Sequence, residues 1–290
     1  MWGPFLEEST HGMVRQRPTG LCRMTQGSRA PVGEPLLAEV EAIAERAGKI
    51  ILEYYQGAIA HRAKADASPV TEADEAAEAA IVPALRALTP DVPVVSEEAV
   101  AAGHIPEVHG PGNPSNRFWL VDPLDGTKEF ISRNGEFTVN IALIEDGRPL
   151  LGVVHVPALA TTYGGIDPGI ARRRREGVTR AIAVRTPPGV GAIVLSSRSH
   201  GDAVAMDAFL EAERVGGHIT AGSALKFCLV AEGIADLYPR LGRTMEWDTA
   251  AGHAVVVAAG GRVTTLDGAA LTYGKPGFEN PHFVARGRAA

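Results

Sequence analysis

The spacing of apolar residues predicts helices in the first third of the chain. Residues 36–55 and 72–88 repeat apolar positions every three or four residues, as amphipathic helices do. The second of these segments follows Thr71 and carries acidic residues in its first turn, a pattern typical of a capped helix start. A short apolar run at residues 92–95 predicts a strand, and the Gly- and Pro-rich residues 99–116 predict an exposed loop.

Strands are predicted to dominate the middle of the chain. Residues 118–121, 138–145 and 150–156 alternate or run apolar as sheet strands do. Asp146-Gly147, between the last two runs, is a hairpin turn signal.

A second region begins near residue 182, where segments with the apolar spacing of helices alternate with segments that have the apolar pattern of strands. Residues 1–35, which lack periodicity, are expected to be a flexible extension. We therefore predict an α+β fold with an α+β half at residues 36–180 and an α/β half at residues 181–290. The second half is expected to hold strands at residues 193–196, 234–238 and 261–265, and helices at residues 203–213, 223–232 and 248–260.

Composition narrows the possible classes of protein. The 290 residues are 45% hydrophobic and 21% charged, with a net charge of −6, which is ordinary for a globular protein. No apolar run approaches the roughly 18 residues that span a bilayer, and the acidic balance disfavours non-specific nucleic-acid binding. The basic run at residues 172–175 is interpreted as a solvated loop, with steering of an anion as the alternative. Two cysteines, Cys22 and Cys228, make no disulfide framework, which favours a reducing, cytoplasmic compartment.

The segment Asp122-Pro123-Leu124-Asp125-Gly126-Thr127 carries the strongest chemical signal. It follows an apolar run, and two carboxylates so close together repel each other unless a cation lies between them. Ligands that are all oxygen point to Mg²⁺. Thr127 opens a segment that is predicted to start a helix, whose N–H groups suit a phosphate. The arrangement indicates a phosphatase, although Asp125-Gly126 alone is also a common turn sequence.

Four motifs in order resemble one family. Residues 119–130 and 246–255 resemble the two signatures of the inositol monophosphatase superfamily, and residues 68–74 and 95–98 match its other motifs. Within it, residues 128–144 and 222–233 are most similar to the bacterial 3′(2′),5′-bisphosphate nucleotidases. The resemblance extends from about residue 36 to the end of the chain.

The resemblance implies a layered α/β/α/β/α fold and a set of site residues. Two or three Mg²⁺ ions would be held by Glu97, Asp122, the carbonyl oxygen of Leu124, Asp125 and Asp248, with Glu98 as an alternative to its neighbour. Asp74 and Thr127 would activate the attacking water. The substrate would be bound by Gly126, Thr127, His200, Ser223, Lys226 and Arg240.

Other roles stay open for several of these residues. Asp248 is also suited to a helix N-cap and Asp74 to the first turn of a helix. Lys226 has the alternative of extending to solvent along its helix. His253, close to Asp248, is expected to be a packed helix residue. Two positions, Arg243 and Glu246, depart from well-known bacterial relatives, which carry Pro and an apolar residue there, and this bears on substrate preference.

The activity that the resemblance implies is Mg²⁺-dependent removal of the 3′-phosphate of adenosine 3′,5′-bisphosphate, giving AMP. Phosphoadenylyl sulfate is expected as a second substrate, and lithium as an inhibitor. The alternatives are an inositol monophosphatase, a fructose-1,6-bisphosphatase, or a non-catalytic regulatory protein. The partner is a small nucleoside bisphosphate rather than a nucleic acid. Location is expected to be cytoplasmic, with loose attachment to the inner membrane left open, as is the oligomeric state.

Overall fold

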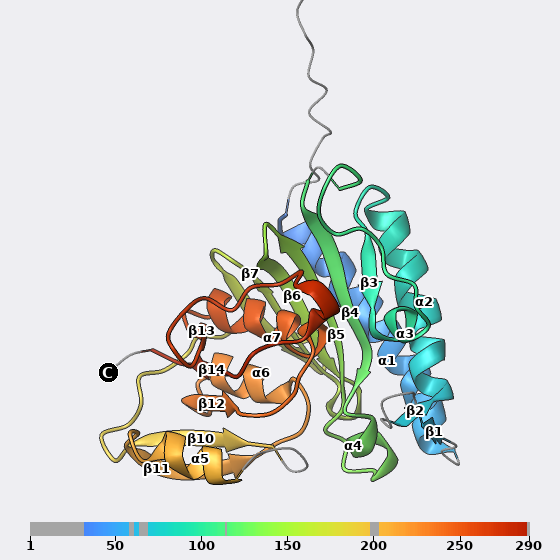
Figure 1. Ribbon diagram of the computed structural model, residues 1–290. Helices are drawn as coiled ribbons and strands as arrows, with labels where there is room; N and C mark the ends of the chain where they lie inside the picture. Colours follow the sequence, from blue (N-terminus) through green and yellow to red (C-terminus); the bar gives the residue numbers. More distant parts are fainter. Residues whose placement is uncertain (1–31, 58–60, 64–68, 114, 198–202, 289–290) are drawn as a thin grey trace, which may run out of the picture.

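Two large β-sheets, each covered by helices on both faces, make up most of the part of the chain that the computed structural model describes: residues 32–57, 61–63, 69–113, 115–197 and 203–288. In Figure 1 the layers follow one another as helices α1 and α2, a seven-stranded sheet, helices α6 and α7, a five-stranded sheet, and helix α5. The predicted α+β class with α/β/α/β/α layers is confirmed.

The first sheet takes its strands in chain order, β3-β4-β5-β6-β7-β8-β9. All neighbours are antiparallel except β3 and β4, which run parallel. Short connections between successive strands make this meander the natural arrangement. Its members are β3 (Val94–Ser96), β4 (Arg117–Asp125), β5 (Thr138–Glu145), β6 (Arg148–Val156), β7 (Thr161–Ile166), β8 (Ile170–Arg175) and β9 (Val178–Ala181).

Helices α1 (Glu34–Gln56) and α2 (Glu72–Leu88) cover one face of this sheet, as Figure 1 shows. Alternation along β4 sorts its side chains: Trp119 and Val121 join the core under α1 and α2, whereas Phe118 and Leu120 face α6 and α7. A two-stranded sheet, β1 (His61–Ala63) with β2 (Pro69–Thr71), leads into α2.

Helix α7 (Glu246–Ala258) lies between the two sheets and is buried along most of its length. It approaches β6 and β7 closely because Gly152 and Gly165 have no side chain. A Cβ on Gly152 would lie 2.3 Å from the carbonyl oxygen of Ala251, and one on Gly165 would lie 2.8 Å from the Cα of Val255. These two glycines therefore set the distance between α7 and the first sheet.

The second sheet has the strand order β11-β10-β12-β14-β13. Helix α6 (Leu225–Ala231) packs between this sheet and α7, and Phe209 and Leu210 of α5 (Ala203–Leu210) cover the opposite face. The strands are β10 (Ala192–Ser196), β11 (Val215–Thr220), β12 (Leu237–Arg240), β13 (Arg262–Thr265) and β14 (Phe283–Arg286), and the remaining short helices are α3 (Glu97–Ala101), α4 (Thr127–Ile131), η1 (Pro157–Leu159) and η2 (Pro276–Phe278).

Predicted and observed elements differ most where the strands are short or polar. The long amphipathic helices lie within two residues of their predicted bounds, but α3 occupies the start of the loop predicted at residues 99–116. Strands β1, β2, β7, β8, β9, β11 and β14 were not predicted. Gly, Arg and Thr hide the alternation in β7, β8, β9 and β11, and β1, β2 and β14 are only three or four residues long.

The interpretation of residues 172–175 as a solvated loop was wrong. They belong to β8, and the arginines at 172, 173 and 174 make ion pairs with acidic residues of the helices. Glu41 and Glu45 of α1 receive two of these arginines, and Glu232, which follows α6, receives the third. Pairing with acids on the adjacent helices lets a run of like charges lie in a sheet.

Two predictions about the ends and halves of the chain stay predictions. The flexible extension falls almost wholly outside the described residues, and α1 begins at Glu34, two residues before the predicted helix. The division between residues 180 and 181 falls inside β9, one residue before that strand ends, and α7 of the second half packs on the first sheet. Among the described helices, none combines the length and the apolar character needed to cross a bilayer.

Candidate active site

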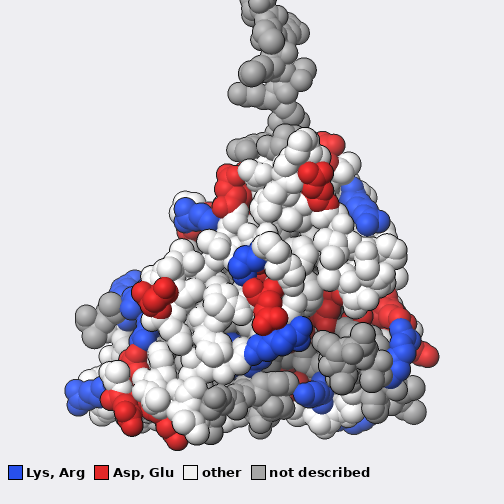
Figure 2. All heavy atoms as spheres, viewed as in Figure 1, with Lys and Arg blue, Asp and Glu red and all other residues white. Residues whose placement is uncertain are grey.

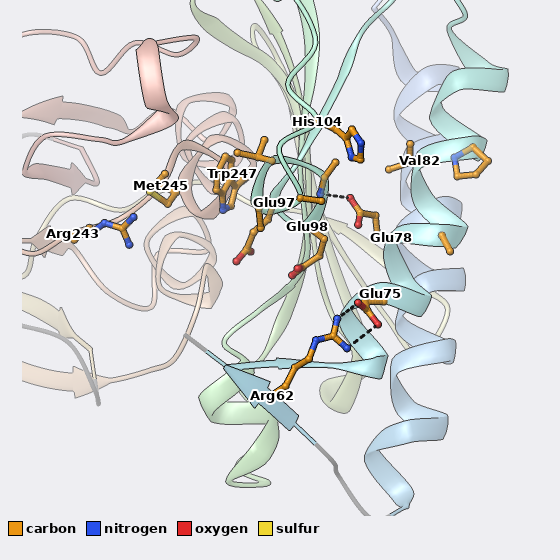
Figure 3. Close-up of a pocket in the computed structure, with 16 residues that line it drawn as sticks. Arg62, Glu75, Glu78, Val82, Glu97, Glu98, His104, Arg243, Met245 and Trp247 are labelled. Carbon is orange, nitrogen blue, oxygen red and sulfur yellow. Dashed lines mark hydrogen bonds and ion pairs between the residues drawn. The ribbon is translucent and has the colours of Figure 1, made fainter. Parts of the chain in front are cut away.

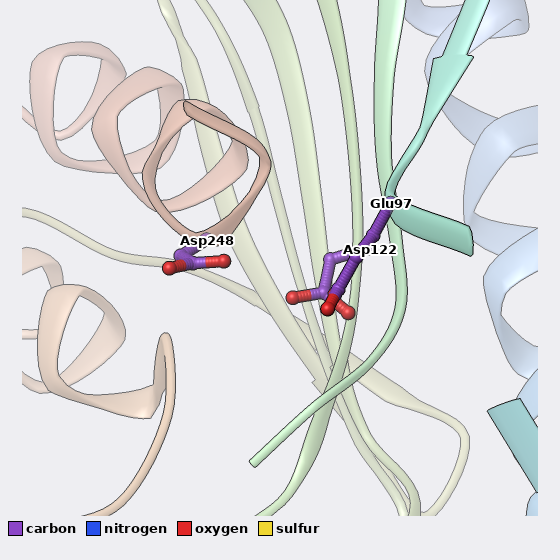
Figure 4. A group of neighbouring side chains, drawn as sticks. All are labelled: Glu97, Asp122 and Asp248. Atoms are coloured by element: carbon purple, nitrogen blue, oxygen red, sulfur yellow. The ribbon is translucent and has the colours of Figure 1, made fainter. Parts of the chain in front are cut away.

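Three carboxylates from separate elements converge where β3 and β4 end. Ser96 of β3 lies opposite Val121 of β4 in a parallel pair, so the residues that follow them, Glu97 and Asp122, come side by side. Asp248, in the first turn of α7, faces them from the other side, as Figure 4 shows. One oxygen of each of the three lies within 4.8 Å of the others.

Burial and mutual repulsion act on this cluster. Loss of water contact, followed by the charge of Glu97, raises the pKa of Asp248 to about 6. Burial, followed by the charge of Asp248, raises the pKa of Asp125 to about 7. Carboxylates in this condition attract a cation. Burial and the neighbouring negative charges therefore raise the pKa of both carboxyl groups, and a bound cation would offset this effect.

A hard divalent cation fits this donor set. Two oxygens on opposite sides of one Mg²⁺ lie about 4.2 Å apart, so the cluster at Glu97, Asp122 and Asp248 needs only small inward movements. Asn140, which pairs with Asp122 across the sheet, has a buried Oδ1 with no hydrogen-bond partner among the described residues. An acceptor oxygen left in this way suits an ion or its bound water.

Asp125 lies outside this group and is bound by the C-terminal half. Its Oδ2 accepts hydrogen bonds from the backbone N–H of Ala224 at 2.7 Å and from the side chain of Asn140 at 3.2 Å. Its carbonyl oxygen lies 2.9 Å from Ser223 Oγ. The structure thus brings together three of the four predicted carboxylates, and the role of Asp125 and of the Leu124 carbonyl as metal ligands stays a prediction.

Asp74 and Thr127 meet as the sequence suggested. Asp74 is 2% exposed, and its Oδ2 accepts hydrogen bonds from the backbone N–H and the hydroxyl of Thr71 at 2.9 and 2.6 Å. Its Oδ1 lies 3.3 Å from the hydroxyl of Thr127. Asp74 therefore caps helix α2 and also contacts the residue after Gly126, so the two readings of this residue do not exclude each other.

Gly126 makes room for the contact between the two halves. Its φ is +89°, in the left-handed region, and a Cβ there would lie 2.0 Å from Ser223 Oγ. That hydroxyl also lies 2.8 Å from the carbonyl oxygen of Glu136. Ser223 therefore acts as a bridge between two backbone segments of the first half.

A cavity of about 400 Å³ opens beside the cluster and contains the predicted basic residues. Lys226 is 3% exposed, and its ammonium donates to the carbonyl oxygens of Ser223 at 2.7 Å and Ala221 at 3.3 Å. Burial lowers its pKa to about 8. The alternative that Lys226 extends to solvent is wrong.

Arg240 reaches the same cavity from β12. Its Nη2 donates to the carbonyl oxygen of Arg243 at 2.7 Å, and its Nε is buried without a hydrogen-bond partner among the described residues. Tyr238, two residues earlier and on the same face of the strand, lies under the Lys226 ammonium. An anion in the cavity would supply an acceptor for the Arg240 Nε.

A second cavity of about 870 Å³ lies on the other side of Glu97, between α2, α3 and the segment before α7 (Figure 3). Its wall is largely apolar and includes Val82, Met245 and Trp247. Arg62 and Glu75, which form an ion pair, lie at its edge. Glu97, Arg243, Met245 and Trp247 line both cavities.

Sequence reasoning missed part of these walls. Met245, Trp247 and Tyr238 line the cavities but were not singled out, although Trp247 stands inside the second motif. His200 lies outside the described residues, as does Cys22. His253 is packed, as expected: it is 6% exposed, and its Nδ1 lies 2.8 Å from the hydroxyl of Tyr273.

Charged residues elsewhere do not form a single-sign surface on the face that is visible. Figure 2 shows acidic and basic side chains of the described residues interspersed on this side of the molecule. This mixture matches a small-molecule cavity better than an extended polyanion surface.

Comparison with known proteins yields one family. The sequence profile of the inositol monophosphatase family matches residues 33–288. The 3′(2′),5′-bisphosphate nucleotidase CysQ of Salmonella typhimurium is 50% identical over 256 residues, which cover 86% of this chain and 98% of the relative. The CysQ of Escherichia coli K12 is 49% identical over 255 residues, with the same coverage.

Solved structures agree with the sequences. The crystal structure of CysQ from Bacteroides thetaiotaomicron, a bacterial member of that family, superimposes with a TM-score of 0.72 and 36% identity, covering 88% of this chain and 98% of that one. An IMPase of Thermotoga maritima gives a TM-score of 0.69 and 26% identity, covering 87% and 92%.

Proposed function

Because the chain belongs to the inositol monophosphatase family, we propose that it is a phosphatase that removes the 3′-phosphate of adenosine 3′,5′-bisphosphate, giving AMP and phosphate. The observation that carries this proposal is the convergence of Glu97, Asp122 and Asp248 beside the Thr127–Asp74 pair. The identity of about 50% to the CysQ nucleotidases over nearly their whole length supports the nucleotide as substrate. Phosphoadenylyl sulfate is proposed as a second substrate.

We assign two or three Mg²⁺ ions to the acidic cluster. Glu97, Asp122 and Asp248 would hold them, with Asp125 and the Leu124 carbonyl completing the set. When bound, the ions lower the pKa of a coordinated water and offset the charge of the phosphate. The convergence of three carboxylates and the raised pKa values of Asp125 and Asp248 support this assignment.

The chain's own residues then handle the attacking water. The Thr127 hydroxyl accepts a hydrogen bond from the attacking water and donates one to Asp74 Oδ1, which lies 3.3 Å away. As the water attacks, its proton moves to Thr127 while the hydroxyl proton of Thr127 moves to Asp74. Asp74 is held in place by the two hydrogen bonds from Thr71. The water oxygen forms a bond to phosphorus as the bond to the 3′-oxygen breaks. The 3′-oxygen takes a proton from a solvent water as AMP leaves, and the proton received by Asp74 returns to solvent.

The N–H groups at the start of α4 suit the reacting phosphate. The first helical hydrogen bond of α4 runs from Phe130 N to Gly126 O, so the backbone N–H groups of the first turn are directed toward the N-terminal end of the helix. Phosphate oxygens are acceptors of the kind that these groups need.

The second phosphate distinguishes a bisphosphate from a simple monoester. We propose that the buried Nε of Arg240 and the third N–H of Lys226 bind it. The other two N–H groups of the Lys226 ammonium donate to backbone carbonyls, and Arg240 Nη2 donates to the carbonyl oxygen of Arg243, so both side chains are held in place. Ser223, which bridges the two halves, and His200 complete the proposed substrate contacts.

The test is phosphate release from adenosine 3′,5′-bisphosphate, inositol 1-phosphate and fructose 1,6-bisphosphate with Mg²⁺. The nucleotide is expected to react with the highest kcat/KM. Arg240→Met is expected to lose about tenfold or more on the bisphosphate, but little on 3′-AMP, which lacks the second phosphate. Arg185→Met, in the same half but paired with Asp236, serves as the control. Preference for a sugar phosphate would contradict the substrate, and no release from any of them would contradict the activity.

A further inference from the structure

Glu246, the first residue of α7, carries a buried carboxylate that is bound by residues of one segment. Its side chain is 0% exposed. Oε2 accepts a hydrogen bond from the backbone N–H of Gly274 at 2.6 Å, and Oε1 accepts one from the N–H of Lys275 at 3.0 Å. The ammonium of Lys275 lies 2.6 Å from Oε1. A carboxylate removed from water in this way needs such partners, so residues 272–280 are bound firmly to the start of α7.

The segment 272–280, here called the strap, returns to the same turn at its far end. Asn280 donates from its backbone to the carbonyl oxygen of Thr244 at 3.0 Å and from its side chain to that of Met245 at 3.0 Å. The Lys275 ammonium also donates to Asn280 Oδ1 at 3.0 Å. The Lys275 ammonium thus links the Glu246 carboxylate to Asn280. Asn280 in turn binds the carbonyl groups of the two residues that precede Glu246.

Those two residues hold Asp248 in turn. The hydroxyl of Thr244 and the backbone N–H of Met245 both donate to Asp248 Oδ2 at 2.9 Å. The carbonyl groups of Thr244 and Met245 face the strap while their donors face Asp248. A chain of direct contacts therefore runs from the Glu246–Lys275 pair, through Asn280, to a carboxylate of the acidic cluster.

We propose that Glu246 and Lys275 are positioning residues that fix the Asp248 carboxylate for divalent-cation binding. This inference rests on the metal site assigned under the proposed function. Outer contacts of metal ligands typically change metal affinity by 10–100-fold when they are removed. The pair acts through the strap and touches neither the substrate nor the ion.

The test measures cation binding directly, by titrating metal-free protein with Mn²⁺ and following the free ion by electron paramagnetic resonance. Glu246→Gln and Lys275→Met are each expected to weaken Mn²⁺ binding by about tenfold. Lys275→Arg, which keeps the cation, is expected to restore binding. In the double variant the two losses should not add, because both substitutions break the same pair.

A matched pair separates positioning from general destabilisation. Asp236 is also 0% exposed, pairs with the partly exposed Arg185 at 2.8 Å, and accepts the N–H of Ile193 at 2.8 Å. Asp236→Asn is expected to lower the unfolding temperature as Glu246→Gln does, yet leave Mn²⁺ affinity within twofold of the unsubstituted protein. At saturating Mg²⁺, the KM of the Glu246 and Lys275 variants for nucleotide should also stay unchanged.

Two results would overturn the proposal. One is Mn²⁺ affinity in Glu246→Gln and Lys275→Met equal to that of the unsubstituted protein. The other is an equal loss in Asp236→Asn, which would make the effect a general one. A third result, the absence of Mn²⁺ binding by the unsubstituted protein, would contradict the metal site itself and therefore both this proposal and the proposed function. Metal-binding protein that fails to hydrolyse the nucleotide would contradict only the proposed function.

Discussion

Buried carboxylates occur in two regions of this molecule, and their surroundings shift the carboxyl pKa in opposite directions. On the face of α1 that meets the first sheet, Glu41 is 1% exposed and is bound by Arg172 through two hydrogen bonds at 2.8 and 3.0 Å. Burial by itself would raise the pKa of Glu45, but hydrogen bonds from Thr162 and Arg174 bring it below its ordinary value. Every charge here has a partner supplied by the chain.

In the active site the carboxylates face one another instead. The pKa values of Asp248 and Asp125 are raised because burial and neighbouring negative charges act in the same direction. The difference teaches that burial of acids is not by itself a functional sign in this fold. The sign is a group of buried acids that lie close enough to raise one another's pKa.

The largest effect is expected from Asp248→Asn. The amide keeps an acceptor for Thr244 and Met245 but removes one charge from the cluster, so activity should fall on the order of 10³-fold, about 4 kcal/mol of transition-state stabilisation. The metal-free protein should unfold at an equal or higher temperature, because repulsion is relieved. Phosphate release and thermal unfolding in chelator check both. A lower unfolding temperature would mean that this cluster, like the α1 region, stabilises the fold.

The complementary substitution is Arg172→Met, which leaves Glu41 buried with only the longer contact to Arg174 at 3.5 Å. The free energy of unfolding is expected to fall by about 3–5 kcal/mol, with metal affinity unchanged. Denaturant unfolding measures the loss. Arg148→Met is the control, since its pair with Asp167 spans 3.8 Å and its side chain is 75% exposed; it should cost less than about 0.5 kcal/mol. Equal losses in the two variants would remove the contrast.

A smaller effect is expected from pH in metal-free protein. The carboxyl groups of Asp125 and Asp248 bind protons more tightly in the folded state than in the unfolded chain, where Asp has a pKa near 3.9. The folded state therefore holds more protons between about pH 4 and pH 7, and the free energy of unfolding should fall as pH rises through this window, by on the order of 3 kcal/mol or less. Thermal unfolding in chelator from pH 4 to pH 8 measures the slope. Mg²⁺ should reverse the decline, and Asp248→Asn should flatten it; a stability that rises with pH would contradict the assignment.

Much of the fold could be predicted because its helices are long and periodic. Residues 36–55 and 72–88 gave α1 and α2, and the apolar run before Asp122 gave β4. The run of arginines in β8 could not be assigned in this way, since a strand of charged residues carries no period of two. Its structure depends on acids more than 100 positions away in the chain.

In the candidate site, too, residues within motifs could be predicted, whereas contacts between distant segments could not. Asp74, Thr127, Glu97, Asp122 and Asp248 belong to the motifs that carry the family resemblance, and that resemblance indicated each of them. The attachment of Asp125 to Ala224, the engagement of the Lys226 ammonium by two carbonyls, and the strap contacts all depend on how the halves dock. Local patterns contain no information on such contacts between distant segments.

Strand β14 gives the second sheet an order of assembly. It is the last described strand to be synthesised, yet it lies inside the sheet, with β12 on one side and β13 on the other. Those two strands, which precede it on the ribosome, have no pairing with each other and are joined only when β14 arrives. A nascent chain thus exposes Glu97 and Asp122 well before the support for Asp248 is complete.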